Sequence, residues 1–191
     1  MKKPSLPEIE SERFLLRQLS DDHFDEWANL KYADPQMMQY MPPSDLAPRE
    51  RAKSAQAFFD ELWSEHGCGA WLIFDKRNRQ LLGDCYLEPA AVSESGEIEI
   101  GYDVGRNFWG KGIATEVAQA VLRFTFEHFA AARIVGVAAK SNLGSRRVLE
   151  RLGFEIENEA TLYGLDAVVD TLSRDRFTPR NAFYKGIQVD G

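Results

Sequence analysis

Two short segments of the sequence carry residues suited to binding a phosphate and to moving a proton. The first is Trp109-Gly110-Lys111-Gly112-Ile113-Ala114-Thr115, which lies between an alternating apolar–polar run and a long stretch of helical periodicity. Glycines let the main chain approach a ligand closely, and the free N–H groups at the start of a helix attract anions. The segment predicts a pyrophosphate site, although two glycines before a helix more often form only a tight turn.

Two common phosphate-binding motifs do not fit this segment. A P-loop requires Ser or Thr directly after its lysine, where this chain has Gly112. A dinucleotide fingerprint requires a glycine or alanine at the position of Thr115, and a series of parallel βαβ units around it. Neither a Walker-type loop nor a Rossmann fingerprint is therefore predicted.

The second segment runs from Asn142 to Phe154 and follows the apolar run 133–138, which predicts a buried strand. Asn142 and Ser145 share the first turn of the helix that this segment predicts. They can be a helix cap and its partner, or two polar groups that face a ligand. Upstream, Glu97 and Glu99 lie on one face of a predicted strand over 97–104, and a carboxylate there can take a proton from an amine.

Together these segments resemble the GNAT superfamily of acetyl-CoA-dependent N-acetyltransferases, and within it the ribosomal-protein N-terminal acetyltransferase branch. The likeness extends over nearly the whole chain and is strongest over 99–102, 109–116 and 142–154. Gly112 and Ala114 match the last two fixed positions of the superfamily signature, Gln/Arg-x-x-Gly-x-Gly/Ala. Trp109 replaces the Gln/Arg, as is usual in this branch.

The resemblance implies that acetyl-CoA is the cosubstrate, with no metal, and that it lies in a V-shaped gap between two central strands. Its pantetheine arm would bind the main chain of the first strand, and its pyrophosphate would bind the glycine turn. The cofactor-binding residues implied in this way are Tyr102, Asp103, Val104, Trp109, Gly110, Lys111, Gly112, Ile113, Ala114, Thr115, Asn142 and Ser145.

The resemblance also implies direct attack of a neutral amine on the thioester. Glu99 fills the family's acidic position and is the expected general base, acting through a water, with Glu97 as the second candidate. Each of them can instead be a solvated strand glutamate, and for Glu97 that interpretation is favoured. A main-chain N–H near Val104 would hold the oxyanion.

The general acid is the point at which the sequence departs from the family. Many members carry a tyrosine seven residues after the asparagine, and it protonates the leaving thiolate. Leu149 stands at that position here. Ser145 is the nearest replacement, and Tyr102 and Tyr163 are remoter candidates.

The expected elements form one α/β (α+β) domain over 1–191, with a loose N-terminus at 1–9 and a C-terminal extension at 177–191. The resemblance implies a GNAT-type mixed, mostly antiparallel sheet of about seven strands, splayed at the acetyl-CoA cleft and flanked by about four helices. The residues predict strands at 13–17, 70–75, 81–87, 97–104, 133–138, 154–163 and 167–172, and helices at 21–30, 48–64, 114–129 and 142–152.

Composition limits the partners. Lys plus Arg number 23 and Asp plus Glu number 30, so the net charge of −7 argues against nucleic acid and suits a cationic acceptor. The chain has neither an apolar run long enough to span a bilayer nor a signal peptide, so we expect no membrane association and a cytoplasmic location. Cys68 and Cys85 lack metal-ligand spacing. A monomer and a homodimer both remain open.

Three functions are consistent with the sequence. The first is N-acetyl transfer to a primary amine, which belongs either to a protein N-terminus or to a small molecule. The second is a non-catalytic acyl-CoA-binding sensor or interaction module of the same fold, which Leu149 alone supports. The third is an unrelated nucleotide-binding protein.

Four early aromatic residues either line an acceptor pocket or belong to the core, namely Trp27, Tyr32, Tyr40 and Trp63.

Overall fold

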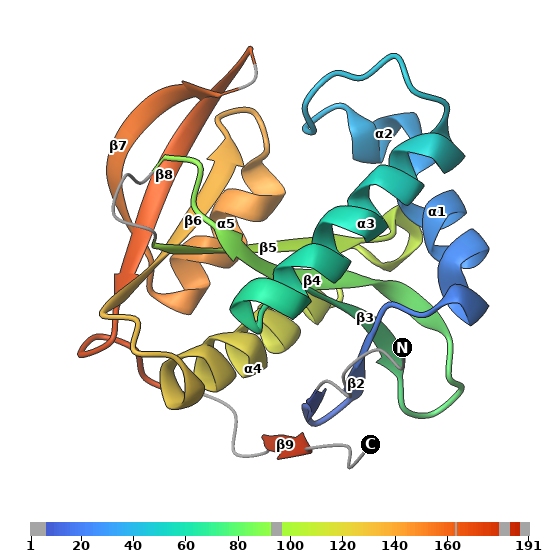
Figure 1. Ribbon diagram of the computed structural model, residues 1–191. Helices are drawn as coiled ribbons and strands as arrows, with labels where there is room; N and C mark the ends of the chain where they lie inside the picture. The colour runs from blue at the N-terminus through green and yellow to red at the C-terminus, as the bar shows by residue number, and fades with distance from the viewer. Residues whose placement is uncertain (1–6, 93–96, 163, 180–183, 188–191) are drawn as a thin grey trace.

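A single open sheet of nine strands runs through the described part of the chain (Figure 1). The computed structural model describes residues 7–92, 97–162, 164–179 and 184–187. The spatial order of the strands is β7-β8-β6-β5-β4-β3-β2-β1-β9. Their bounds are β1 Glu8–Glu10, β2 Phe14–Gln18, β3 Ala70–Asp75, β4 Leu81–Pro89, β5 Ile98–Val104, β6 Arg133–Ala139, β7 Glu155–Leu162, β8 Leu165–Ser173 and β9 Lys185–Ile187.

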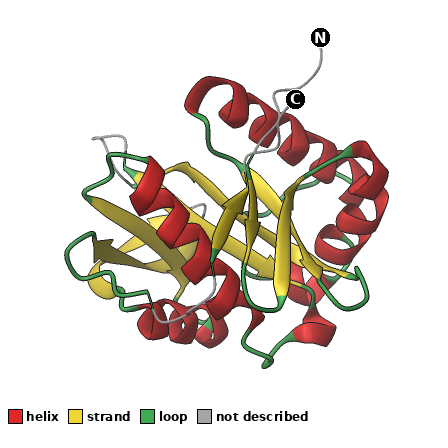
Figure 2. Ribbon diagram, turned by 90° about the horizontal axis from the view of Figure 1, so that it is seen from below, coloured by secondary structure: helices red, strands yellow, loops and turns green. Residues whose placement is uncertain are grey.

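Five α-helices pack on the two faces of this sheet (Figure 2). Alternate residues of β3 show the division, because side chains in a strand point to opposite faces in turn. Trp71 and Ile73 pack in the cluster that contains the residues of α4, whereas Leu72 and Phe74 pack with those of α1. The helices are α1 Phe24–Tyr32, α2 Pro35–Met38, α3 Pro48–His66, α4 Ile113–His128 and α5 Leu143–Leu152, with short 3-10 turns at Asp21–His23 and Arg106–Phe108.

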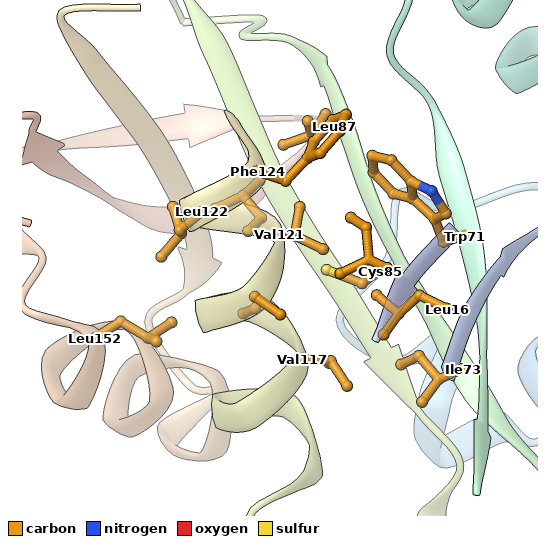
Figure 3. Packing of buried hydrophobic residues seen from close by; sticks show 14 of the residues in the cluster. Leu16, Trp71, Ile73, Cys85, Leu87, Val117, Val121, Leu122, Phe124 and Leu152 are labelled. Carbon is orange, nitrogen blue, oxygen red and sulfur yellow. The ribbon is translucent and has the colours of Figure 1, made fainter. Parts of the chain in front are cut away.

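The main core lies between α4 and the central strands. Figure 3 shows Val117 and Val121 of α4 facing Cys85, Ile73 and Leu16 of the strands. Val117 and Val121 lie on the same side of α4, as the apolar periodicity of the helix predicts. The core therefore fixes α4, and with it the glycine turn at its start, against the sheet.

The sheet is split between its only described pair of parallel neighbours. β5 and β6 pair at Ile98 with Ile134 and at Glu99 with Val135. Beyond Glu99 no further pairs join them, although β5 continues to Val104 along β4 and β6 continues to Ala139 along β8. The expected splay of a mostly antiparallel sheet is thus confirmed, and it leaves main-chain edges of both strands unpaired.

Two strands and one helix were not expected from the sequence. The sheet has nine strands rather than about seven, because the three-residue strands β1 and β9 are too short for a detectable alternation. Of the expected loose segment 1–9, residues 1–6 lie outside the described residues, whereas Glu8 and Ile9 belong to β1. The third addition is α2, which begins where Asp34 accepts a hydrogen bond from the main-chain N–H of Gln36.

The described residues of the C-terminal extension, 177–179 and 184–187, pack along α4 and onto β1. The Phe177 ring lies 5.1 Å from that of Phe126, and Gln119 Nε2 donates to the Thr178 carbonyl at 3.4 Å. β9 then pairs antiparallel with β1. Among the described residues, no helix is long and apolar enough to cross a membrane.

Candidate functional site

A cavity of about 1010 Å³ begins at the split between β5 and β6 and extends to α1, α2 and α3. This volume is at the upper end of the ~300–1,000 Å³ typical of ligand sites. One arm is lined by Ile100–Val104, residues 137–139 and the glycine turn, and the other by residues of the first three helices. The cavity therefore has room for two ligands that meet at β5.

The glycine turn has the conformation that its residues predict. Gly110 and Gly112 adopt φ angles of +75° and +73°, which are strained for any residue with a Cβ. Gly112 caps the N-terminus of the sixteen-residue α4, whose first N–H groups lack helical partners. Trp109 Nε1 donates to the Val104 carbonyl at 2.5 Å. This bond ties the turn to the end of β5.

Eleven of the twelve predicted cofactor residues line the cavity, and Lys111 does not. Lys111 Nζ donates to the Asn107 carbonyl at 3.2 Å and lies 5.4 Å from the centre of the Phe108 ring. The side chain thus folds back over the preceding turn. Its neighbours that line the cavity are Trp109, Gly110, Gly112, Ile113, Ala114 and Thr115.

Tyr102 and Ser145 meet across the split in the sheet. The Tyr102 hydroxyl lies 3.1 Å from Ser145 Oγ and donates to the Ser145 carbonyl at 3.1 Å. Burial raises the pKa of Tyr102 well above its usual range, so its hydroxyl stays protonated. Asn142 Oδ1 accepts from the Ser145 N–H at 3.1 Å, so Asn142 caps α5 while it also lines the cavity.

Glu99 lies on β5 and lines the cavity. Burial raises its pKa to about 8, and the negative charge of Glu88 adds to the shift. Glu88 is its direct partner on β4 and also lines the cavity. A carboxylate that titrates near neutral pH is suited to act as a general base.

Glu97, the second candidate base, does not line the cavity. Its carboxylate forms a bidentate ion pair with Arg133, whose Nη2 lies 3.0 Å from Glu97 Oε2. Arg133 also donates to Glu157 at 2.7 Å. The structure places Glu97 in a network that joins β5, β6 and β7 at the closed end of the split.

The position of the missing tyrosine is filled by packing. Leu149 is 1% exposed, and its Cδ2 would lie 2.6 Å from a Cβ added to Gly136. Leu149 therefore needs the glycine opposite it on β6. It brings no hydroxyl to the cavity, whereas Tyr102 and Ser145 both line it. Tyr163, the other candidate, lies outside the described residues.

The early aromatic residues divide between the two expectations. Tyr40 lines the helix-lined arm of the cavity, and Tyr32 lines it while also packing in the core with Trp27. Trp27 and Trp63 belong to the core at 0% and 5% exposed. The sequence reasoning overlooked three further aromatic residues in this arm, which are Phe58, Phe59 and Tyr86. Phe58 and Phe59 show no signal beyond their place on a predicted helix.

A buried lysine that lines the cavity was also overlooked. Lys31 Nζ lies 3.1 Å from Asp84 Oδ1 and 2.7 Å from Asp103 Oδ2. Burial alone would lower the pKa of Lys31, but Asp103 and Asp84 raise it above its usual value. Trp27 Nε1 donates to the other Asp84 oxygen at 2.5 Å. The Asp103 carboxylate thus pairs with Lys31 through Oδ2.

The metal-ligating residue types do not gather in this site. Within the described ranges, no group of three or more His, Cys, Asp or Glu residues has the geometry to hold a metal ion. Cys68 and Cys85 are both buried as free thiols, and burial raises the pKa of each.

A sheet that opens between two parallel strands, above a glycine turn at the start of a helix, is the architecture of acyl-CoA-dependent acyltransferases. Residues 13–155 match the family described as the acetyltransferase (GNAT) domain. The chain therefore belongs to the GNAT acetyltransferase family and is an acyltransferase. Acetyl-CoA is the acyl donor that this family uses.

Curated and solved relatives agree with this membership. An uncharacterised N-acetyltransferase, p20 of Bacillus licheniformis, is 29% identical over 147 residues, which are 77% of this chain and 82% of p20. RimJ of Mycobacterium smegmatis, solved with CoA-disulfide, has a TM-score of 0.77 at 20% identity and covers 93% of each chain. The ribosomal-protein-S5-alanine acetyltransferase of Vibrio fischeri has a TM-score of 0.73 at 20% identity, covering 90% of this chain and 99% of that one. At these identities the two structures show a shared fold.

Proposed function

We propose that this protein transfers the acetyl group of acetyl-CoA to a primary amine by direct attack on the thioester. The observation that carries the proposal is that Glu99, with a raised pKa, lines the same cavity as the glycine turn and the aromatic residues of the first three helices. The cofactor arm also fits the ligand. An added Cβ at Gly110 would meet nothing within 4 Å, which leaves room for phosphate oxygens against the main chain.

In the proposed mechanism, Glu99 takes a proton from the acceptor ammonium through a water. The neutral amine nitrogen then bonds to the acetyl carbon, and the carbon–sulfur bond breaks. A main-chain N–H near Val104 stabilises the oxyanion between these steps. The attached nitrogen then loses its second proton, and Ser145, hydrogen-bonded to Tyr102, passes its hydroxyl proton to the thiolate while it takes up the proton from the nitrogen. That help is modest, because a thiol of pKa ~8.5 is a tolerable leaving group.

Two acceptor classes fit the aromatic arm, a protein α-amine and a small-molecule amine. The ribosomal-protein-S5-alanine acetyltransferase among the fold neighbours makes a protein N-terminus the first class to test. An α-amine of pKa ~7.7–8.0 also needs less help from a base than a lysine amine of pKa ~10.4.

The test is an acceptor screen that measures thiol release from acetyl-CoA and confirms N-acetylation by mass spectrometry. The screen uses peptides with different N-termini, amino acids, polyamines and arylalkylamines. We expect turnover with at least one class, and loss of that turnover in Glu99→Gln with acetyl-CoA binding retained. Tight acetyl-CoA binding without acetylation of any amine would instead favour the non-catalytic sensor.

A further inference from the structure

Arg13 connects the β1–β2 turn to the glycine turn. Its Nη1 donates to the Lys111 carbonyl at 3.1 Å, 98 positions away along the chain. Its Nη2 would lie 3.6 Å from a Cβ added to Gly112. Its Nε donates to Glu116 Oε2 at 2.7 Å. One guanidinium therefore holds both the turn and the helix that follows it.

Glu116 is a buried carboxylate in the first turn of α4, and the residue is 8% exposed. Its Oε1 accepts from Ser11 Oγ at 2.7 Å and from the Arg13 N–H at 2.8 Å. A negative charge near a helix N-terminus is favourable by itself. At this helix, however, it lies beside the proposed pyrophosphate site, where an unpaired carboxylate would repel the ligand. The donors of Ser11 and Arg13 offset that charge.

We propose that Arg13 is a positioning residue for acetyl-CoA, which fixes the glycine turn at Lys111 and neutralises Glu116 beside the phosphates. The inference rests on the proposed function for its ligand. It assigns Arg13 an indirect role, because the guanidinium does not line the cavity. A lysine cannot replace it fully, since one ammonium cannot reproduce the fork that spans Glu116 and Lys111.

The neighbouring strand offers a matched control. Arg17 on β2 pairs with Glu8 through its Nε at 2.8 Å, and the side chains of Arg17 and Arg13 are both 42% exposed. Arg17→Ala thus removes a comparable ion pair that is remote from the glycine turn. Any effect of Arg13→Ala beyond that of Arg17→Ala reports on the turn and on Glu116.

The experiment measures the Kd for acetyl-CoA by calorimetry in the wild type, Arg13→Ala, Arg13→Lys, Arg17→Ala and the double variant Arg13→Ala/Glu116→Gln. We expect Arg13→Ala to weaken binding about tenfold or more, Arg13→Lys to weaken it less, and Arg17→Ala to leave it unchanged within about twofold. The double variant should recover most of the loss, because it removes the carboxylate that Arg13→Ala leaves without its guanidinium partner. With an acceptor in hand, KM for acetyl-CoA should rise while kcat stays near the wild-type value.

Two results would overturn the inference. One is equal affinity in Arg13→Ala and Arg17→Ala, and the other is no recovery in the double variant, which would leave Arg13 with a purely structural role. If Arg13→Ala does not fold, as judged by its thermal midpoint, Arg13→Lys and Glu116→Gln provide the same comparison. Failure of the wild type to bind acetyl-CoA would instead contradict the proposed function itself.

Discussion

The Tyr102 hydroxyl and Ser145 Oγ lie 3.1 Å apart, and this contact joins β5 to α5 across the open part of the sheet. The two residues belong to segments that the sequence reasoning treated separately, with Ser145 as the expected acid and Tyr102 as a remoter candidate. Together they form one hydroxyl pair at the cofactor arm. Tyr102 and Ser145 thus bring two hydroxyls to the cavity, to which Leu149 contributes none.

Removal of the Ser145 hydroxyl should slow the reaction without weakening the binding of acetyl-CoA. We expect Ser145→Ala to lower kcat by about tenfold, below the usual range for a general acid, because the thiolate leaves tolerably well unaided. KM for acetyl-CoA should change by less than about twofold. Tyr102→Phe should lower kcat by a similar or smaller factor. Steady-state kinetics of the two single variants and the double variant measure the coupling, and additive effects would show that the two hydroxyls do not act together.

Glu99 should set the pH dependence of the reaction. It must be ionised to accept a proton, and its pKa is about 8. With an amine acceptor, the logarithm of kcat/KM should therefore rise more steeply with pH below about 8 than it does in Glu99→Gln. Glu88→Gln should move this break to lower pH, since it removes a like charge from the opposite strand. An equally steep rise below pH ~8 in the wild type and in Glu99→Gln would exclude Glu99 as the base.

The same shift should appear in stability, with a definite sign. The pKa of Glu99 is about 8 in the folded protein and ~4.3 for an unfolded glutamate. The folded state therefore holds the proton more tightly, and the stability it contributes below pH ~4.3 is lost as the pH rises through about 8. Urea unfolding at pH 6 and pH 9 should show a larger loss in the wild type than in Glu99→Gln. Glu150→Gln, on the exposed side of α5, should behave like the wild type.

Lys31 should be essential to stability. Lys31→Met leaves the buried carboxylates of Asp84 and Asp103 without their cation, which typically costs about 3–5 kcal/mol. Lys53→Met is the control, because its pair with Glu50 at 3.0 Å is exposed and such pairs contribute less than about 1 kcal/mol. Urea unfolding of the two variants measures the difference. Equal losses would contradict the assignment of Lys31 as a buried counter-ion.

Local features of the fold and site were predictable from the sequence. The positive φ angles at Gly110 and Gly112 follow from two glycines before a helical pattern. The cap at Asn142 and the left-handed Gly153 at the other end of α5 follow from residue type and spacing alone. In each case the information lies within a few residues of chain.

Pairings between distant residues were not predictable from the same patterns. The helical periodicity predicts that Glu116 lies on the polar face of α4. It is nevertheless buried, because Ser11 and Arg13, 105 and 103 positions earlier in the chain, cover it and donate hydrogen bonds to its carboxylate. Lys31 is buried for the same reason, since Asp84 and Asp103 reach it from two other elements. The hydrophobic periodicity of a sequence indicates which face of a helix or strand a residue occupies. It does not indicate which distant residue it contacts there.

We expect acetyl-CoA to bind on the glycine turn, in the cavity between β5 and β6. Calorimetric titration of the purified protein, freed of co-purified CoA, tests it directly in the wild type, Gly112→Glu and Gly67→Glu. Gly67 is the matched control, because its φ of +65° is also left-handed and an added Cβ there meets nothing within 4 Å. We predict binding by the wild type and Gly67→Glu, and loss of binding in Gly112→Glu. Absence of binding in folded wild type would show that the protein does not bind acetyl-CoA. Equal binding by all three proteins would show that acetyl-CoA does not bind on the glycine turn.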